Sequence, residues 1–192
     1  ATSTLYTRPL EFHTAQTLKC ATFAAGHQMG KTLVLPLLHN KATAKPIFTQ
    51  GASGAFVLTN GVRGSLKQTD FEWCSWSKSD CISFTLDLQK DENIHTFTLG
   101  SITVYVMAVH KPESISVALS SDNVNFTEVG EKHFTPEEIF REGTYVEDLK
   151  FDLGTAKARY VRVTARGVGK CPPDHVRPGQ EARIFFDEII VE

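Results

Sequence analysis

A regular succession of short strand-like segments limits this chain to an all-β fold. The segments are rich in β-branched and aromatic residues, and polar turn clusters separate them. They cover residues 81–88, 94–99, 102–109, 115–120, 126–131, 145–152, 160–165 and 182–191. Turns are predicted at 90–93, 121–123, 154–157 and 167–169. Helical periodicity is almost absent, and a Thr-Pro-Glu-Glu capping pattern indicates one short helical turn within residues 135–141. This pattern is typical of an antiparallel β-sandwich or jelly roll.

The composition suits a buried β core and argues against two classes of partner. Phe occurs 13 times, against two Trp and four Tyr, and 41% of the residues are hydrophobic. The formal net charge is −2 and the sequence pI is near 6.4, so no global positive field attracts nucleic acid or anionic membranes. No apolar run reaches the roughly 18 residues of a membrane span. We therefore expect neither nucleic-acid binding nor membrane insertion.

The beginning of the chain differs from the rest. Residues 16–24 alternate in polarity, and glycines after them predict a hairpin turn before residues 32–35. A sheet of so few strands cannot bury a core of its own. We expect residues 1–38 to be part of a small β-sandwich module in a longer, processed protein, and residues 39–192 to form one jelly-roll domain.

The sequence gives little support for catalysis. It has no Gly-x-Ser-x-Gly elbow, His-Glu-x-x-His motif, Walker loop or Gly-x-Gly-x-x-Gly. Asp187 and Glu188 are adjacent in the apolar final segment, so on a strand they point to opposite faces and cannot flank one glycosidic bond. The seven His are scattered, and none pairs with another at metal-ligand spacing. We expect no enzyme activity from this chain.

The four cysteines leave two alternatives open. They are Cys20, Cys74, Cys81 and Cys171, and they form no Cys-x-x-Cys motif. Cys74 and Cys81 bracket one loop, so a disulfide between them would suit an exported protein. Four small buried or half-buried thiols are the other alternative.

Five stretches of the chain, in their order and spacing, resemble one known family. They are residues 40–46 (Asn-Lys-Ala-Thr-Ala-Lys-Pro), 58–65 (Leu-Thr-Asn-Gly-Val-Arg-Gly-Ser), 120–126 (Ser-Ser-Asp-Asn-Val-Asn-Phe), 158–163 (Ala-Arg-Tyr-Val-Arg-Val) and 186–189 (Phe-Asp-Glu-Ile). These resemble the discoidin-like, coagulation-factor-type C domain, whose fold is shared with family 32 carbohydrate-binding modules. With residues 5–10 and 170–172 added, the chain resembles the C-terminal region of bacterial family 20 β-N-acetylhexosaminidases (chitobiases). There, a catalytic barrel is followed by a small Ig-like module and then by the discoidin-like module.

The resemblance implies an eight-stranded antiparallel jelly roll, preceded here by part of the Ig-like module. It implies a non-catalytic accessory module that binds a glycan with a terminal hexosamine or galactose-type sugar. The parent catalytic domain is then a second partner, and the parent enzyme is exported to the periplasm or the cell surface of a bacterium. The alternative is a structural module that packs on that domain or mediates dimerisation and binds no sugar.

The resemblance also implies one structural Ca²⁺ where a loop meets the last strand. Asn60 stands at a position that is commonly Asp, and Glu188 at that of the C-terminal carboxylate ligand. Backbone oxygens near Arg63 and the Ser65 hydroxyl would complete the oxygen shell. The alternative is that Glu188 or Asp187 pairs with an arginine such as Arg63 or Arg162.

The expected sugar contacts lie on loops at one end of the jelly roll. Trp76 is the candidate for an exposed platform on which a sugar ring stacks, whereas Trp73 matches a family position that packs beneath the barrel end. His110, His175 and Arg177 lie on loops expected at the same end and would supply polar groups.

Overall fold

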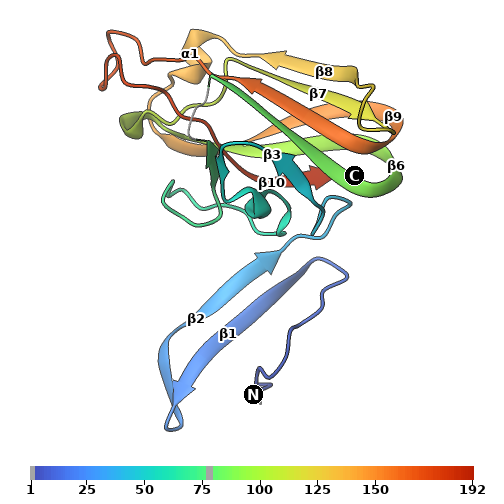
Figure 1. Ribbon diagram of the computed structural model, residues 1–192. Coiled ribbons are helices and arrows are strands. Elements are labelled where there is room, and N and C mark those ends of the chain that lie inside the picture. The colour runs from blue at the N-terminus through green and yellow to red at the C-terminus, as the bar shows by residue number, and fades with distance from the viewer. Residues whose placement is uncertain (1–2, 77–79) are drawn as a thin grey trace. The chain divides into compact units, whose positions relative to one another are not determined.

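The computed structural model describes residues 3–76 and 80–192, in two compact units that divide after His39. The first unit is an antiparallel hairpin of β1 (Gln16–Ala24) and β2 (His27–Leu37), shown in blue in Figure 1. Its strands carry large apolar side chains that remain more than half exposed: Phe23, Met29, Leu33 and Val34. The hairpin therefore buries little apolar surface of its own.

The second unit, Asn40–Glu192, is an antiparallel jelly-roll β-sandwich, as predicted. Its strand order is β4-β5-β10-β6-β9-β7-β8, and β3 pairs with β6. The strands are β3 (Ile47–Thr49), β4 (Ala52–Ser53), β5 (Cys74–Trp76), β6 (Cys81–Val104), β7 (Ser114–Ser120), β8 (Thr127–His133), β9 (Thr144–Arg166) and β10 (Phe185–Val191). The helical elements are the 3₁₀ turns η1 (Ala55–Thr59) and η2 (Tyr105–Met107) and the helix α1 (Pro136–Ile139).

Two long strands replace several short predicted ones. β6 and β9 pair from Cys81↔Arg166 to Val104↔Thr144, so the turns predicted at 90–93 and 154–157 do not interrupt them. Instead the register shifts between Asp87 and Glu92, where the ribbon bends (Figure 1). A bulge of this kind bends a strand without ending its pairing, and one ribbon therefore contributes to both layers of the sandwich.

Aromatic rings fill much of the space between the layers. Phe84, Phe97 and Phe186 are almost completely buried, and Phe97 packs against Phe151 with 6.2 Å between ring centroids. The short helix α1 begins with the predicted capping box, in which the Thr135 hydroxyl accepts the Glu138 N–H and the Glu138 carboxylate accepts the Thr135 N–H. No helix in the described part of the chain is both long and apolar enough to cross a membrane.

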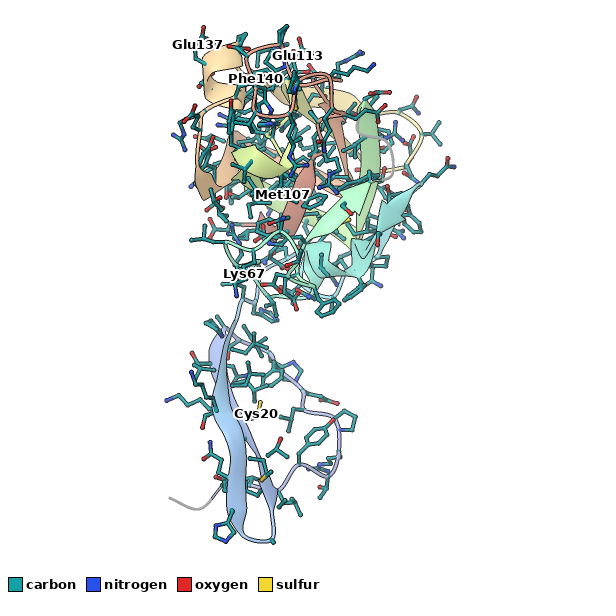
Figure 2. The ribbon with its side chains drawn as sticks, turned by 90° about the vertical axis from the view of Figure 1, so that its left-hand side faces the viewer. Cys20, Lys67, Met107, Glu113, Glu137 and Phe140 are labelled. Carbon is teal, nitrogen blue, oxygen red and sulfur yellow. The ribbon has the colours of Figure 1, made fainter. Side chains whose placement is uncertain are left out.

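None of the four cysteines forms a disulfide in the structure, and the expected burial of the thiols holds for only two of them. Cys74 and Cys171 are buried, whereas Cys81 and Cys20, the latter on the hairpin in Figure 2, are exposed. Cys74 is on β5, which pairs with β10, and its side chain lies in the core. Burial raises the pKa of its thiol to about 12. Cys74 therefore behaves as a small apolar side chain.

Candidate functional site

A groove of about 640 Å³ lies beside β3, β5 and the first residues of β6. It is lined by Phe48, Thr49, Gln50, Gly51, Trp76, Cys81, Ile82 and Ser83. Because side chains alternate along β3, Phe48 turns outward and its side chain is 55% exposed. Gln50 and Ser83 are exposed as well. The groove thus combines an accessible aromatic ring with polar side chains, which is what holds a sugar ring in a binding site.

Trp76 forms an inner wall of this groove and is not an exposed platform, so that expectation is wrong. β5 pairs with β10, and the alternation along β5 turns both Cys74 and Trp76 into the core. The indole stacks on Phe84 at 5.8 Å between centroids, is 5% exposed, and donates its Nε1–H to the Thr49 hydroxyl at 3.1 Å. Trp73, expected to be buried, is 6% exposed.

His110 and His175 are also buried, at 1% and 4% exposure, so neither presents the exposed polar group that was expected on a loop. Their rings lie 5.1 Å apart between centroids, and Tyr105 covers His175 at 4.1 Å. Phe140 packs on His110 at 5.0 Å. Arg177 is exposed, and its Nε–H donates to the Val106 carbonyl. The structure thus brings the two imidazoles together near Arg177, and none of the three lines the groove that contains Trp76.

His110, Cys171 and His175 form what we call the imidazole–thiol cluster. One ligand atom from each residue lies within 4.8 Å of the others. Burial lowers the pKa of His110 to about 4 and raises the pKa of the Cys171 thiol, which favours the neutral form of each group. The Cys-x-x-x-His spacing of Cys171 and His175 is a mixed pair of ligand types, which patterns of histidine alone or of cysteine alone do not reveal.

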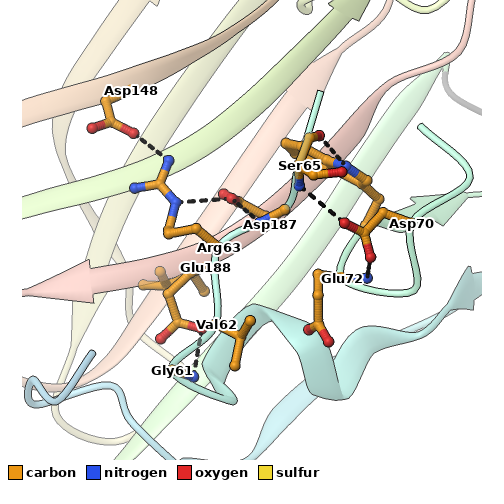
Figure 3. A network of polar contacts seen from close by, with 12 residues as sticks. Gly61, Val62, Arg63, Ser65, Asp70, Glu72, Asp148, Asp187 and Glu188 are labelled. Atoms are coloured by element: carbon orange, nitrogen blue, oxygen red, sulfur yellow. Dashed lines mark hydrogen bonds and ion pairs between the residues drawn. The ribbon is translucent and has the colours of Figure 1, made fainter. Parts of the chain in front are cut away.

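A second polar group, the carboxylate cluster of Arg63, Asp187 and Glu188, lies where the 61–64 loop meets β10 (Figure 3). The Arg63 Nε–H donates to Asp187 Oδ2 at 2.8 Å, and an Nη2–H donates to Asp148 at 2.6 Å. The predicted alternative, an ion pair with Arg63, is therefore correct for Asp187. Burial alone would lower the pKa of Arg63, but the bond to Asp148 and the charge of Asp187 raise it.

Asp187 fits its place because the facing residue is Gly100. A Cβ at Gly100 would lie 1.8 Å from Asp187 Oδ1 and 2.5 Å from an Arg63 nitrogen. Burial raises the pKa of Asp187, and Arg63 and the Gly64 N–H oppose that rise. Asp187 and Glu188 both bond to the 61–64 loop because the register of β10 shifts between Phe186 and Ile189. The strict alternation assumed from the sequence does not hold at this bulge.

Glu188 has no cationic partner of its own within residues 3–76 and 80–192. Its Oε2 accepts the Gly61 N–H at 2.8 Å, while its buried Oε1 has no hydrogen-bond partner among these residues. Burial raises the pKa of Glu188 to about 8, and the charges of Asp187 and Glu72 act in the same direction. Glu188 is therefore a buried acid with one free oxygen.

The other predicted calcium ligands, Asn60 and Ser65, make hydrogen bonds in different parts of the loop. Asn60 precedes Gly61; its amide donates to Glu72 at 2.6 Å, and its Oδ1 accepts the Val62 N–H at 2.8 Å. The Ser65 hydroxyl accepts the Lys67 N–H at 3.3 Å, within a separate turn. Loop contacts thus bring Asn60 and Glu188 together, whereas the Arg63 and Ser65 side chains are engaged elsewhere.

Comparison with known proteins gives one family and a set of similar folds. The F5/8 type C domain family model matches residues 43–173. A fucose-binding module of Streptococcus pneumoniae is 18% identical, with a TM-score of 0.53 over 88% of this chain and 98% of that one. Chitosan-binding module 1, derived from a chitosanase/glucanase of Paenibacillus sp. IK-5, is 17% identical, with a TM-score of 0.52 over 80% and 98%. No curated protein matches the chain significantly.

Proposed function

Because this chain belongs to the F5/8 type C domain family, we propose that it is a non-catalytic carbohydrate-binding module. The solved structures of similar fold include modules described as fucose-binding and chitosan-binding, which supports a sugar as the ligand. The observation that carries the proposal is the groove beside Phe48, where an exposed aromatic ring adjoins polar side chains. Its volume of about 640 Å³ lies within the range of small-molecule sites.

In this groove Phe48 is the stacking surface for a sugar ring. Its face is apolar and accessible, and the axial C–H groups of a pyranose would cover it. Gln50 and Ser83, both exposed at the groove, offer amide and hydroxyl groups for the sugar hydroxyls. Thr49 is less available, because its hydroxyl already donates to the Ser83 carbonyl at 3.1 Å and accepts from Trp76. A terminal hexosamine or galactose-type sugar is the proposed ligand.

Calorimetric titration of the full chain with N-acetylglucosamine, N-acetylgalactosamine and galactose tests this proposal. Phe48→Ala should weaken binding about fivefold or more, because loss of stacking on an aromatic side chain costs on the order of 1–3 kcal/mol. Phe56→Ala is the matched control, since Phe56 is 72% exposed but lies outside the groove. Equal binding by the two variants, or no binding of any glycan on an array by the parent chain, would overturn the proposal.

The finer proposal is that the module serves an exported β-N-acetylhexosaminidase of a bacterial periplasm or cell surface. The chitobiase-like stretches at residues 5–10 and 170–172 support it. The description of the chitosan-binding relative as derived from a chitosanase/glucanase supports the role of an enzyme accessory. The parent catalytic domain is then the partner that the glycan-bound module holds near its substrate.

A structural role is the second candidate, and the hairpin favours it. Four large apolar side chains, Phe23, Met29, Leu33 and Val34, are each more than half exposed on only two strands. Exposed apolar side chains on a minimal sheet are typical of a surface that packs against further chain. We propose that residues 1–38 belong to a small Ig-like module. Failure of glycan binding together with association through the hairpin would favour this function over the first.

We further propose a structural Ca²⁺ held by Glu188. The buried Oε1 without a partner is a hard oxygen donor, and Glu72 and Asn60 add oxygen atoms close to the same loop. Loop carbonyls would complete the shell, because the side chains of Arg63 and Ser65 have other partners. The melting temperature of the parent chain should be higher in calcium than in chelator, whereas that of Glu188→Gln should be the same in both. An identical melting temperature of the parent chain in both conditions would contradict this site.

A further inference from the structure

The imidazole–thiol cluster lies outside the glycan groove and has no part in the function proposed above. His110 is anchored before β7, where its N–H donates to the Arg183 carbonyl at 2.9 Å. Cys171 and His175 belong to the connection between β9 and β10, which folds back on itself through the Lys170↔Glu181 bridge. The cluster therefore joins two segments that are about 60 residues apart in the sequence.

The hydrogen bond of His110 orients its other nitrogen toward the thiol. Nδ1 lies 3.1 Å from the Ile139 carbonyl, which can only accept, so Nδ1 carries the proton. Nε2 therefore keeps its lone pair, which faces the Cys171 thiol at 4.0 Å from Sγ and can accept its S–H. A backbone carbonyl that holds one ring N–H while the other nitrogen faces a ligand site is the usual arrangement around a metal-bound histidine.

His175 provides the second, independent sign of a ligand. Its Nδ1 accepts the Arg177 N–H at 2.9 Å, but its Nε2 is buried and has no hydrogen-bond partner in the described residues. A buried imidazole nitrogen without a partner is costly. The rings of Tyr105 and Phe140 pack around both histidines, so this nitrogen lies among aromatic side chains.

We propose that His110 Nε2, Cys171 Sγ and His175 Nε2 bind one Zn²⁺ ion, which ties the β9–β10 connection to the segment before β7. Two imidazoles and one thiolate are the nitrogen and sulfur donors that zinc prefers, and they do not suit calcium or magnesium. Three protein ligands leave the fourth position to a water molecule.

Zinc binding releases one proton to the solvent and requires the three ligand atoms, which lie within 4.8 Å of one another, to approach. The Cys171 thiol releases one proton as the thiolate–zinc bond forms, and the proton of His175 moves from Nε2 to Nδ1. That shift gives up the hydrogen bond from the Arg177 N–H. Sulfur and nitrogen ligands of a tetrahedral zinc lie about 3.5 Å apart, so the 4.0 Å separation of Cys171 and His110 must shorten by about half an ångström.

Cobalt titration of the full chain tests the site, with Co²⁺ as the visible substitute for Zn²⁺. The starting protein carries Cys20→Ala and Cys81→Ala, which remove the two exposed thiols and leave Cys171 in place. We expect one equivalent of Co²⁺ to give a thiolate-to-cobalt charge-transfer band together with the visible bands of a four-coordinate ion. One equivalent of Zn²⁺ should abolish both.

Variants assign the band to this cluster. In the same background, Cys171→Ser should lose the charge-transfer band, and His175→Gln should weaken Zn²⁺ binding at least tenfold. Cys74→Ala is the matched control, because Cys74 is equally buried but lies apart from both histidines. It should keep the band.

Two results would overturn the proposal. One is the absence of a thiolate–cobalt band in the metal-free starting protein with Cys171 reduced. The other is an unchanged band after Cys171→Ser or unchanged zinc affinity after His175→Gln, with circular dichroism showing a folded variant. If either substitution prevents folding, the starting protein alone tests the proposal: it should show the band with Co²⁺ and lose it when Zn²⁺ is added. Because Phe48→Ala leaves these ligands intact, glycan binding and zinc binding fail or succeed independently.

Discussion

Two clusters of ionisable side chains are buried in the same sandwich, and they are stabilised in different ways. In the carboxylate cluster, Arg63 pairs with Asp187 through Oδ2, whereas Asp187 Oδ1 and Glu188 Oε1 have no hydrogen-bond partner among the described residues. In the imidazole–thiol cluster burial favours the neutral forms of His110 and Cys171, and Nε2 of His175 has no hydrogen-bond partner among the described residues. The first holds hard oxygen donors and the second holds nitrogen and sulfur donors. The interior of this sandwich therefore contains two clusters with unpartnered polar atoms, and each cluster suits a different class of cation.

The largest expected effect on stability is that of removing Arg63, which forms an ion pair with Asp187 in the carboxylate cluster. Arg63→Met removes the partner of Asp187, which is 0% exposed, and leaves an uncompensated buried charge. The free energy of unfolding should fall by about 3–5 kcal/mol in chemical denaturation at neutral pH. A loss below about 1 kcal/mol would mean that the pair does not balance the cluster.

The pH dependence of Glu188 is expected to be of similar size. Its pKa is about 8 in the folded chain against 4.5 in the unfolded chain, so the folded state keeps a proton that the unfolded state releases between these values. In calcium-free buffer, stability should fall as pH rises from 4.5 to 8, at up to about 1.4 kcal/mol per pH unit. Glu188→Gln should lack this component, and calcium should reduce it in the parent chain. Parallel pH profiles of the two proteins would contradict the assignment.

His110 should give the opposite slope over a narrower range. Its pKa is about 4 when folded and 6.5 when unfolded, so the unfolded chain takes up a proton first as the pH falls. Stability of the metal-free chain should therefore decline from pH 6.5 toward pH 4. His110→Asn, which keeps a donor for the Ile139 carbonyl, should flatten this part of the profile. An unchanged slope in denaturation series would show that His110 does not titrate in this way.

The smallest effect is expected at the exposed edge of the carboxylate cluster. Asp148 also bonds to Arg63, but its side chain is 52% exposed. Solvent screens such a pair, so Asp148→Asn should cost about 1 kcal/mol or less. If Asp148→Asn lowered the free energy of unfolding as much as Arg63→Met does, Asp148 and Asp187 would contribute equally despite their different burial.

The fold followed from local patterns, and the site did not. Alternation and turn residues predicted the strands because each pattern reports on its own segment, and Thr135 and Glu138 similarly predicted the cap of α1. The bend within β6 was missed because a bulge and a turn use the same polar residues. Trp76 is buried because β5 pairs with β10, a partner more than 100 residues away.

The groove and the thiol cluster have weak sequence signals for the same reason. Phe48 lies on a three-residue strand, too short for its alternation to be recognised. His110 meets Cys171 and His175 only through the folding of the β9–β10 connection, which the sequence does not reveal. The Cys171–His175 spacing was visible in the sequence, but without His110 it offers only two ligands.

The most direct test of glycan binding at the Phe48 groove is an amide chemical-shift map of the full chain during titration with N-acetylgalactosamine, N-acetylglucosamine or galactose. Binding in the groove should shift the signals of Gln50, Gly51 and Ser83 in a saturable way. Shifts confined to Val106 and Arg177, or the absence of any saturable shift, would contradict the account.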